Sequence, residues 1–427
     1  MKLPRLALPA LAFAGLLPAA EPALTFSAAR EAALKAHPRI TVARLRTLIA
    51  HEGEIEARGA YLPLVGANAT LVRSGQQITR ITSGTLSNSQ IFDHVGVGAT
   101  LSLLVTDFGR TASLNEAARQ RARAAEADAL ATRAQLLLEV DAAYFDALRT
   151  HAVQAVARQT LAARQAQFER TRVLAESQLK SELDVRFARV AVDEARLLVD
   201  SSEKDWRVAA AILGDLIGAT EPIEGGRLEV PAAPGELPAA AEPLAAAALQ
   251  ARPELQRQRA EAEALRAAAR AARDATRPTL SLVASAGYTP MDDPRFERKY
   301  SAGALNLSVP LFAGGIYRSR ERQASAQAEA AEAALQDRSN LVVRDVRLAW
   351  LEAGHARERM ALTQSLLENA EAALTLARSR FEQGLSSTVE LTQAELARTS
   401  AEIARTTADF SYRVRRTILD YQTGALR

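Results

Sequence analysis

The sequence predicts a mostly α-helical protein with a β-barrel part, built from two copies of one structural unit. Three observations lead to this prediction. The stretch 110–176 runs for 67 residues without proline or glycine, and its apolar residues recur at helical intervals. A similar stretch follows 206 positions later. Ahead of each of them, apolar and small polar residues alternate with the period of a β-strand.

The length of the helical stretch indicates an elongated protein. At about 1.5 Å per residue, one helix of this length extends on the order of 100 Å. A compact globular domain cannot bury such a helix. Alanine recurs along it, which lets neighbouring helices approach closely as in coiled coils. We therefore expect long coiled-coil helices as the main structural element.

The second observation is an internal duplication. On one helical stripe, the first-half residues and their counterparts 206 positions later are Leu137 and Val343, Val140 and Val346, and Tyr144 and Trp350. Upstream the offset is 215, as between Pro63 and Pro278, so the first copy holds nine additional residues before Leu101. A repeat of about 200 residues is too long for a solenoid unit and indicates a duplicated, domain-sized half.

The third observation is a pair of predicted β-hairpins. In the first copy, the alternating apolar residues are Val95, Val97, Ala99, Leu101, Leu103 and Val105. Their partner strand is expected at about 62–72, across a Ser/Thr-rich loop at 74–90. In the second hairpin, Pro310 should lie near a strand end because proline breaks a central ladder. Strands of about ten residues with one apolar and one small polar face fit membrane strands better than the alternative, a soluble β-sandwich fragment.

These observations define an order of elements along the chain. The first structural repeat covers 21–218, with a helix, a hairpin at about 62–106, a long helix at 110–176 and a helix at 183–217. A Pro/Gly-rich linker covers 219–242. The second repeat covers 243–427, with a helix, a hairpin at about 279–312, a long helix at 316–382 and a helix at 389–423. Four strands cannot close a barrel, and lipid does not tolerate an open edge, so several chains should share one barrel.

The first twenty residues resemble a secretory signal peptide. Basic residues precede an apolar run from Leu6 to Leu17, and small residues follow it up to Ala20. We expect cleavage after Ala20 and export of the remaining chain. An N-terminal membrane anchor is the alternative, but the run is short and holds Pro9 and Gly15.

Composition restricts the possible functions. The 53 Lys and Arg residues nearly balance the 50 Asp and Glu residues, so nucleic-acid binding is not implied. The chain has no cysteine, which excludes disulfides, thiolate metal sites and a lipid anchor on an N-terminal cysteine. The five histidines are scattered, and Asp292-Asp293 fit a surface turn. We expect no enzyme activity, no metal and no cofactor.

The whole pattern resembles the TolC-like outer-membrane efflux protein family. The local motifs that carry the resemblance are the segments 28–38, 307–315 and 381–385. The resemblance implies a homotrimer in which each chain gives four strands to a 12-stranded outer-membrane barrel, continued by an α-helical tunnel across the periplasm. It also implies a periplasmic adaptor (membrane fusion) protein and an inner-membrane pump or ABC transporter as partners, in efflux or type I secretion.

The turns that follow the two long helices, here called the first and second tips, carry the candidate site. Ser181 stands three residues before Asp184, and Ser387 three before Glu390. Both pairs fit a capping box, which is a sufficient structural explanation. The functional interpretation, compatible with it, is that symmetry copies of the two acids form rings at the pore entrance.

The resemblance implies further roles at the tips. Asp184, Phe381 and Glu390 fall where relatives place gate and selectivity residues. Adaptor docking is expected at the tip residues Leu179, Ser181, Gly384, Leu385 and Ser387. The chain departs from the family in having Ser386 where some members have arginine, Gln393 in place of a second acid, and Ser177 in place of the expected glycine.

The favoured function is therefore a passive exit duct in the outer membrane, opened at its periplasmic tip. Two rivals remain open at this point. A periplasmic adaptor would have one helical hairpin and β-rich domains around it. A structural coiled-coil surface protein would have no conduit.

Overall fold

The computed structural model describes residues 24–73, 79–82, 88–91, 94–225, 228–290 and 297–426. The expected signal peptide and the Asp292-Asp293 turn lie outside the described residues. The chain divides into two units. The tip unit consists of the described residues up to Ala36 with Glu139–Gly235 and Glu358–Val414, and the strand unit of His37–Leu138, Glu236–Arg357 and the C-terminal residues from Arg415.

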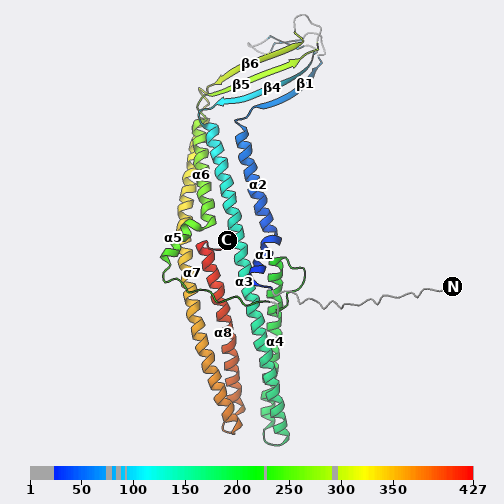
Figure 1. Cartoon of the computed structure of the whole chain (residues 1–427), viewed down its shortest axis with the longest axis vertical. Coiled ribbons are helices and arrows are strands. Elements are labelled where there is room, and N and C mark those ends of the chain that lie inside the picture. Colours follow the sequence, from blue (N-terminus) through cyan, green and yellow to red (C-terminus); the bar gives the residue numbers. More distant parts are fainter. Residues whose placement is uncertain are drawn as a thin grey trace, which may run out of the picture. The chain divides into compact units, whose positions relative to one another are not determined.

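The strand unit contains a four-stranded antiparallel sheet in the order β1-β4-β5-β6 (Figure 1). The strands are β1 (Leu64–Val72), β4 (His94–Thr106), β5 (Thr279–Tyr288) and β6 (Lys299–Ser308). Each repeat contributes two of them, and the central pair β4 and β5 joins the repeats. The predicted fold class, long helices with four strands per chain, is confirmed.

The pairing register sorts the strand residues into two faces. Residues directly opposite each other in a ladder point to the same side of a sheet. On the apolar face, one row is formed by Val65, Leu101, Ala284 and Gly303, and the next by Ala67, Ala99, Ala286 and Ser301. On the polar face, the intervening row is Gly66, Thr100, Ser285 and Ala302. One face is therefore rich in apolar side chains, and the other carries mostly small and polar ones.

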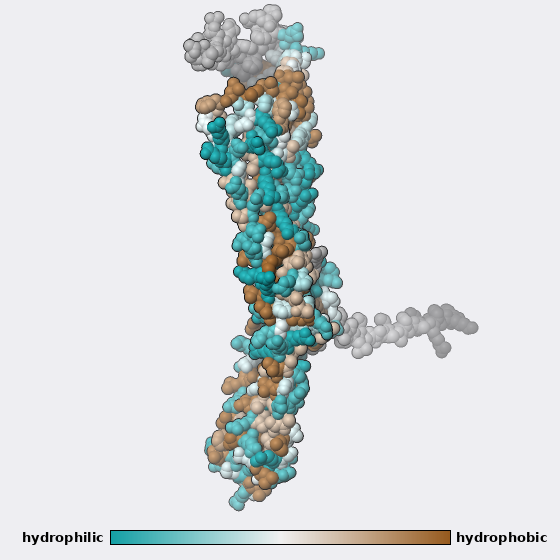
Figure 2. Space-filling model, turned by 90° about the vertical axis from the view of Figure 1, so that its left-hand side faces the viewer, coloured by the Kyte–Doolittle hydropathy of each residue, from teal (hydrophilic) through white to brown (hydrophobic). Residues whose placement is uncertain are grey.

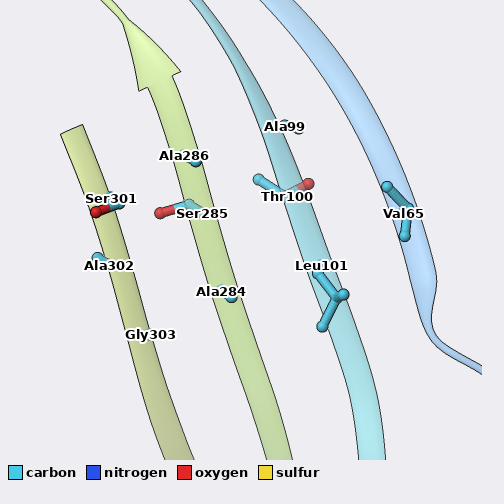
Figure 3. Close-up of a pocket in the computed structure, with 10 residues that line it drawn as sticks. All are labelled: Val65, Ala99, Thr100, Leu101, Ala284, Ser285, Ala286, Ser301, Ala302 and Gly303. Carbon is cyan, nitrogen blue, oxygen red and sulfur yellow. The ribbon is translucent and has the colours of Figure 1, made fainter. Parts of the chain in front are cut away.

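A shallow hollow of about 530 Å³ lies over the middle of the sheet, and Figure 3 shows its lining residues on the four strands. Seven of the ten belong to the two apolar-face rows just described, and several of these are only alanine, serine or glycine. Leu64, Val65, Leu71, Leu305 and Leu307 leave more than half of their surface exposed. Figure 2 shows hydrophobic surface gathered over this strand region. Such exposure on a sheet indicates a partner other than water.

Two predictions about the strands need correction. The segment 74–90 was expected to be a loop, but Thr79–Thr82 (β2) pairs with Asn88–Ile91 (β3) in a short hairpin. The strand β6 begins at Lys299, well before the alternation that starts at Leu305. The sequence Ala302-Gly303-Ala304 gives no apolar alternation, so periodicity cannot detect this half of the strand.

The helices of the strand unit pack through small side chains. They are α2 (Pro38–Gly59), α5 (Glu242–Ala251), α6 (Pro253–Asp274) and the first parts of α3 (Arg110–Glu176) and α7 (Ile316–Glu382). Ala245, Ala248, Val342 and Val346 form a buried cluster between α5 and α7. In the part of the chain that the structure describes, no helix is both long and apolar enough to cross a membrane.

The tip unit is built from two helical hairpins and α1 (Phe26–Ala36) (Figure 1). The end of α3 turns into α4 (Glu182–Ile217), and the end of α7 turns into α8 (Thr388–Thr423). The buried positions of α4 include Ala188, Ala191, Ala195 and Ala209, which recur at helical spacing. Alanine at these positions lets the helices approach closely.

A polar cluster joins α1, α3 and the linker in the tip unit. Arg30 of α1 forms a bidentate ion pair with the fully buried Asp141 of α3, with Nε–Oδ1 and Nη2–Oδ2 distances of 2.7 and 2.5 Å. The Tyr144 hydroxyl lies 2.7 Å from the carbonyl oxygen of Glu229 in the linker, and burial raises the pKa of Tyr144 to about 12. Its repeat counterpart Trp350 donates to the carbonyl oxygen of Pro238 at 2.8 Å, within the strand unit. Both copies of this aromatic position therefore hold the linker.

Candidate functional site

The two tips of the tip unit share one backbone geometry. In the second tip, Gly384 has φ +75°, and Leu385 N–H donates to the Arg380 carbonyl at 2.8 Å. In the first tip, Gln178 has φ +57°, and Leu179 N–H donates to the Leu174 carbonyl at 2.8 Å. Both are Schellman-type helix ends, in which one residue adopts the left-handed conformation.

This geometry corrects one sequence interpretation. Ser177 is not the residue in place of glycine, because its N–H still donates to the Val173 carbonyl at 3.2 Å, in the helical pattern. The counterpart of Gly384 is Gln178, which adopts a conformation that costs a non-glycine residue energy. The first tip therefore forms the same turn as the second, with strain at one residue.

The two leucines that follow these turns project into solvent. Leu179 is 71% exposed and Leu385 65% exposed. In a Schellman helix end, the residue at this position commonly packs back against its own helix. These leucines remain largely uncovered, so capping does not explain them. They are suited to contact another protein.

At the start of α4, Ser181 and Asp184 form a complete capping box. Asp184 N–H donates to Ser181 Oγ at 3.2 Å, and the Asp184 carboxylate accepts from Ser181 N–H at 3.1 Å and from Ser181 Oγ–H at 2.7 Å. The other carboxylate oxygen accepts from the hydroxyl of Thr388, at 2.7 Å. Thr388 begins α8 and is only 4% exposed. Asp184 thus caps its own helix and ties the first tip to the second.

These hydrogen bonds favour the charged form of Asp184. The Thr388 hydroxyl is the main cause of a lowered Asp184 pKa, and the Ser181 side chain adds to it. Partial burial opposes the shift, while Lys180 supports it through its positive charge. The carboxylate therefore stays ionised at neutral pH, which both the cap and the link require.

The second tip has a different arrangement around its acid. Glu390 N–H donates to Ser387 Oγ at 3.3 Å, which is the serine half of a capping box. The Glu390 carboxylate faces Arg380 at 3.6 Å, and both side chains are nearly half exposed. An arginine therefore does lie beside this acid, but it comes from the end of α7 instead of position 386.

Phe381 lies within the protein beneath Lys180. It is 8% exposed, and the Lys180 ammonium stands 4.4 Å above its ring centroid. A cation over an aromatic face at this distance is attractive. Because Lys180 follows the first long helix and Phe381 lies in the last turn of the second, this contact is a second link between the tips.

A buried ion pair supports the tips from behind. Arg164 of α3 binds Glu395 of α8, with side chains only 9% and 14% exposed. Burial raises the pKa of Glu395, and the charges of Arg164 and Arg378 counteract that rise. Arg164 also lies 3.4 Å from the Thr392 carbonyl oxygen. The two hairpins are therefore joined by three side-chain contacts: Asp184 with Thr388, Lys180 with Phe381, and Arg164 with Glu395.

The site brings together some predicted residues and adds others. Ser181 with Asp184 and Ser387 with Glu390 lie at the tips, and Asp184 is adjacent to the second tip. Lys180, Thr388, Arg164 and Glu395 were not identified from the sequence. Thr388 occupies the repeat position of Glu182, so comparison of the copies gave no signal for a bond to Asp184. Within the described residues, no three metal-ligating side chains cluster.

The chain thus combines long helical hairpins, a two-faced four-stranded sheet and two linked tips. The chain matches the family described as Outer membrane efflux protein over residues 29–219 and 244–424. It therefore belongs to the outer membrane efflux protein family. The resemblance inferred from the sequence is confirmed.

Individual relatives agree with this assignment. The chain is 26% identical over 345 residues to Outer membrane protein OprJ of Pseudomonas aeruginosa, covering 77% of this chain and 70% of that protein. The structure of the Campylobacter jejuni CmeC outer membrane channel has a TM-score of 0.80 at 16% identity, covering 93% of this chain and 85% of that chain. The open Neisseria gonorrhoeae MtrE channel has a TM-score of 0.78 at 22% identity, with 93% and 88% covered. The two structural likenesses establish the fold.

Proposed function

We propose that this outer-membrane efflux channel is a passive exit duct in which three copies of the chain close one 12-stranded barrel. The sheet carries this proposal. Its apolar face suits lipid, and its small polar face suits a water-filled lumen. Its edge strands β1 and β6 have no partner strand among the described residues of the chain. Pairing between copies removes these edges, as a barrel in lipid requires.

The exposed helix faces support assembly from several copies. On α2, the side chains of Val42, Leu45, Leu48, Ile49 and Ile55 are 46% to 70% exposed, and on α4 Leu183, Phe187, Val190 and Leu197 are 46% to 72% exposed. Their spacing places them along one side of each helix. A second copy of the chain can cover both stripes, which would continue the barrel as a helical tunnel.

The tips are proposed as the gate and the docking surface of this duct. Three copies of Asp184 and Glu390 would place six carboxylates at the entrance, which favours cations. Phe381, beneath Lys180, holds the closed arrangement. Leu179 and Leu385 would bind the helical hairpin of a periplasmic adaptor, with Gly384 and the capping serines Ser181 and Ser387 shaping the surface around them. The adaptor would connect the duct to an inner-membrane pump or ABC transporter.

Cysteine cross-linking tests the closed barrel directly, because the natural chain has no cysteine. Ala67 on β1 and Ser301 on β6 lie in one apolar-face row at opposite edges of the sheet. Within one chain, two strands separate them, which is too far for a disulfide. We expect Ala67→Cys with Ser301→Cys to give a covalent trimer under oxidation. Scanning residues 299, 301 and 303 on β6 allows for the register between copies.

In a matched control, the cysteine on the edge strand β1 is moved to the central strand β4. Ala99 on β4 lies in the same row but pairs within the sheet, so Ala99→Cys with Ser301→Cys should assemble without forming covalent oligomers. Cross-linked species that stop at a dimer or grow without limit would contradict a three-copy barrel. No cross-link at any scanned position would also contradict it.

Two rivals predict other results. A periplasmic adaptor or a structural coiled-coil protein would have no lipid-facing sheet and no conduit. Neither accounts for an apolar sheet face on strands of membrane length. The cargo is selected by the transporter in this proposal, so drug efflux and type I secretion are separated by identifying the pump that copurifies with the duct.

A further inference from the structure

One row on the polar face of the sheet differs from its neighbours. It consists of Asn68 on β1, Gly98 on β4, Gly287 on β5 and Tyr300 on β6. Most other polar-face residues of these strands are small or aliphatic. Among the residues of the four strands, Tyr300 carries the only phenyl ring on this face. A phenyl ring on the face assigned to the lumen needs a specific arrangement.

The Tyr300 ring lies along the sheet surface, across β5. A methyl group added at Gly287 would stand 2.4 Å from both Cζ and Oη of Tyr300. A methyl group added at Gly98, one strand further, would stand 2.5 Å from Tyr300 Oη and 3.1 Å from the backbone carbonyl oxygen of Ala286. Neighbouring strands are about 4.8 Å apart, so a ring that reaches from β6 to β4 lies parallel to the sheet. The ring therefore occupies a groove that the two glycines leave open.

Two other glycines of the sheet provide a contrast. At Gly66, on the same face, an added methyl group would meet only Thr100 Oγ1, at 3.6 Å. At Gly303, on the apolar face, it would meet nothing within 4 Å. Gly98 and Gly287 are thus the positions where a side chain and the Tyr300 ring cannot both fit. An aromatic ring over a strand glycine also stabilises a sheet, so a test must separate that role from an effect on the lumen.

We infer that Gly98 and Gly287 set the width of the channel on the barrel side by holding the Tyr300 ring against its wall. This inference rests on the proposed duct. An upright ring would project into the lumen, and three symmetry copies would do so together. With the glycines present, the same three rings line the wall and leave the passage wide. Tyr300 then affects transport through the position of its ring, which the two glycines set.

Polymer exclusion in planar bilayers tests the inference. Polyethylene glycols of graded size, added on the barrel side, report the largest polymer that enters the lumen. The recordings use Asp184→Ala with Glu390→Ala as background, so that the tips are loosened. We expect Gly287→Ala to lower the size cut-off and the conductance. Gly66→Ala should leave both unchanged, because its methyl group has room.

Removing the ring provides the decisive comparison. Gly287→Ala with Tyr300→Ala should restore the original size cut-off. If the Tyr300 ring only stabilised the sheet, its removal should instead damage the channel further. If Gly287→Ala does not assemble, Gly98→Ala takes its place and should narrow the lumen by a smaller amount than is expected for Gly287→Ala. Adding Tyr300→Phe to Gly98→Ala should relieve that narrowing by removing the hydroxyl. Equal cut-offs for Gly66→Ala and the assembled Gly287→Ala or Gly98→Ala variant would overturn the inference. A lowered cut-off that persists without the ring would overturn it too. Absence of conductance from every variant, background included, would instead overturn the proposed duct.

Discussion

The two tips have the same backbone and different chemistry. Both end their long helix in a Schellman-type turn and place an acid three residues after a serine. The Asp184 carboxylate uses both oxygens in hydrogen bonds, to Ser181 and to Thr388. The Glu390 carboxylate faces a partly exposed arginine at 3.6 Å. The two repeats therefore share the turn and differ in the acid: Asp184 links the repeats, whereas Glu390 lies at the surface.

This difference teaches that a repeated motif need not have a repeated role. A capping box explains Ser181, but it uses only one side of the Asp184 carboxylate. The hydrogen bond from Thr388 connects the two hairpins through residues that are 204 positions apart in sequence. Release of the first tip should therefore loosen the second, whereas Glu390 can be changed with little effect on the first.

The largest expected effect comes from the ion pair behind both tips. Arg164→Ala removes the hydrogen-bonded partner of the largely buried Glu395 carboxylate and leaves only the charge of Arg378 to stabilise it, which should cost about 3 kcal/mol of stability. We expect a lower thermal transition of the assembled protein. The deficit should shrink at acid pH, because protonated Glu395 no longer needs a cation. Arg164→Ala with Glu395→Gln is the control, and equal stability of the wild type and Arg164→Ala would contradict the role of the pair.

Removing the Asp184 carboxylate should have the next largest effect. Asp184→Ala removes the acid half of a capping box and the link to Thr388, and each lost hydrogen bond should cost about 1 kcal/mol. Conductance in planar bilayers should rise, and the preference for cations should fall. Adding Glu390→Ala should extend both changes. Unchanged ion selectivity in the double variant would leave the acids with a capping role alone.

A smaller change separates the link from the charge. Thr388→Val keeps the shape of the side chain and removes its hydroxyl, at an expected cost of about 1 kcal/mol. Conductance should rise while cation preference stays, because the carboxylates remain. Ser386→Ala, two residues away, serves as control. Equal conductance of the Thr388→Val and Ser386→Ala variants would show that the two tips are not coupled through Asp184.

Thr388→Val should also change how conductance depends on pH. Because the folded protein lowers the pKa of Asp184, the link contributes stability above the ordinary carboxyl pKa of 3.8 and loses it as pH falls through the lower folded value. Wild-type conductance should therefore be constant between about pH 5 and 8 and should rise only in stronger acid. In Thr388→Val the acid transition should move to higher pH. A transition that does not move would contradict the assignment of the shift to Thr388.

The smallest effect is expected at Glu390. Its ion pair with Arg380 is exposed, and such pairs contribute about 0.2–1 kcal/mol, less at high salt. Glu390→Gln should therefore leave thermal stability nearly unchanged and reduce cation preference slightly. A loss of stability larger than that of Asp184→Ala would reverse the comparison between the tips.

Much of the fold could be predicted because it depends on local patterns. The absence of proline and glycine over 110–176 predicts the long helix, and alternation predicts most of β1, β4 and β5. The repeat offset places the tips in both copies. The first half of β6 gives no such signal, since Ala302, Gly303 and Ala304 show no alternation. The glycine groove beneath Tyr300 also depends on register between strands, which the sequence does not specify.

The site shows the same limit. Capping boxes are local, so Ser181 and Asp184 could be paired from their spacing. The Asp184 link to Thr388, the Arg164 pair with Glu395 and the Lys180 contact with Phe381 join residues far apart in sequence. They depend on how the hairpins pack, and no local pattern reports that packing.

The central claim is that this chain forms a conduit that its tips close. Planar-bilayer recording of the purified trimer tests it most directly, with wild type compared with Asp184→Ala and Glu390→Ala combined. Wild type should show a small, cation-preferring conductance, and the double variant a larger conductance with weaker cation preference. Absence of conductance from both proteins, with trimers present in the bilayer, would contradict the account.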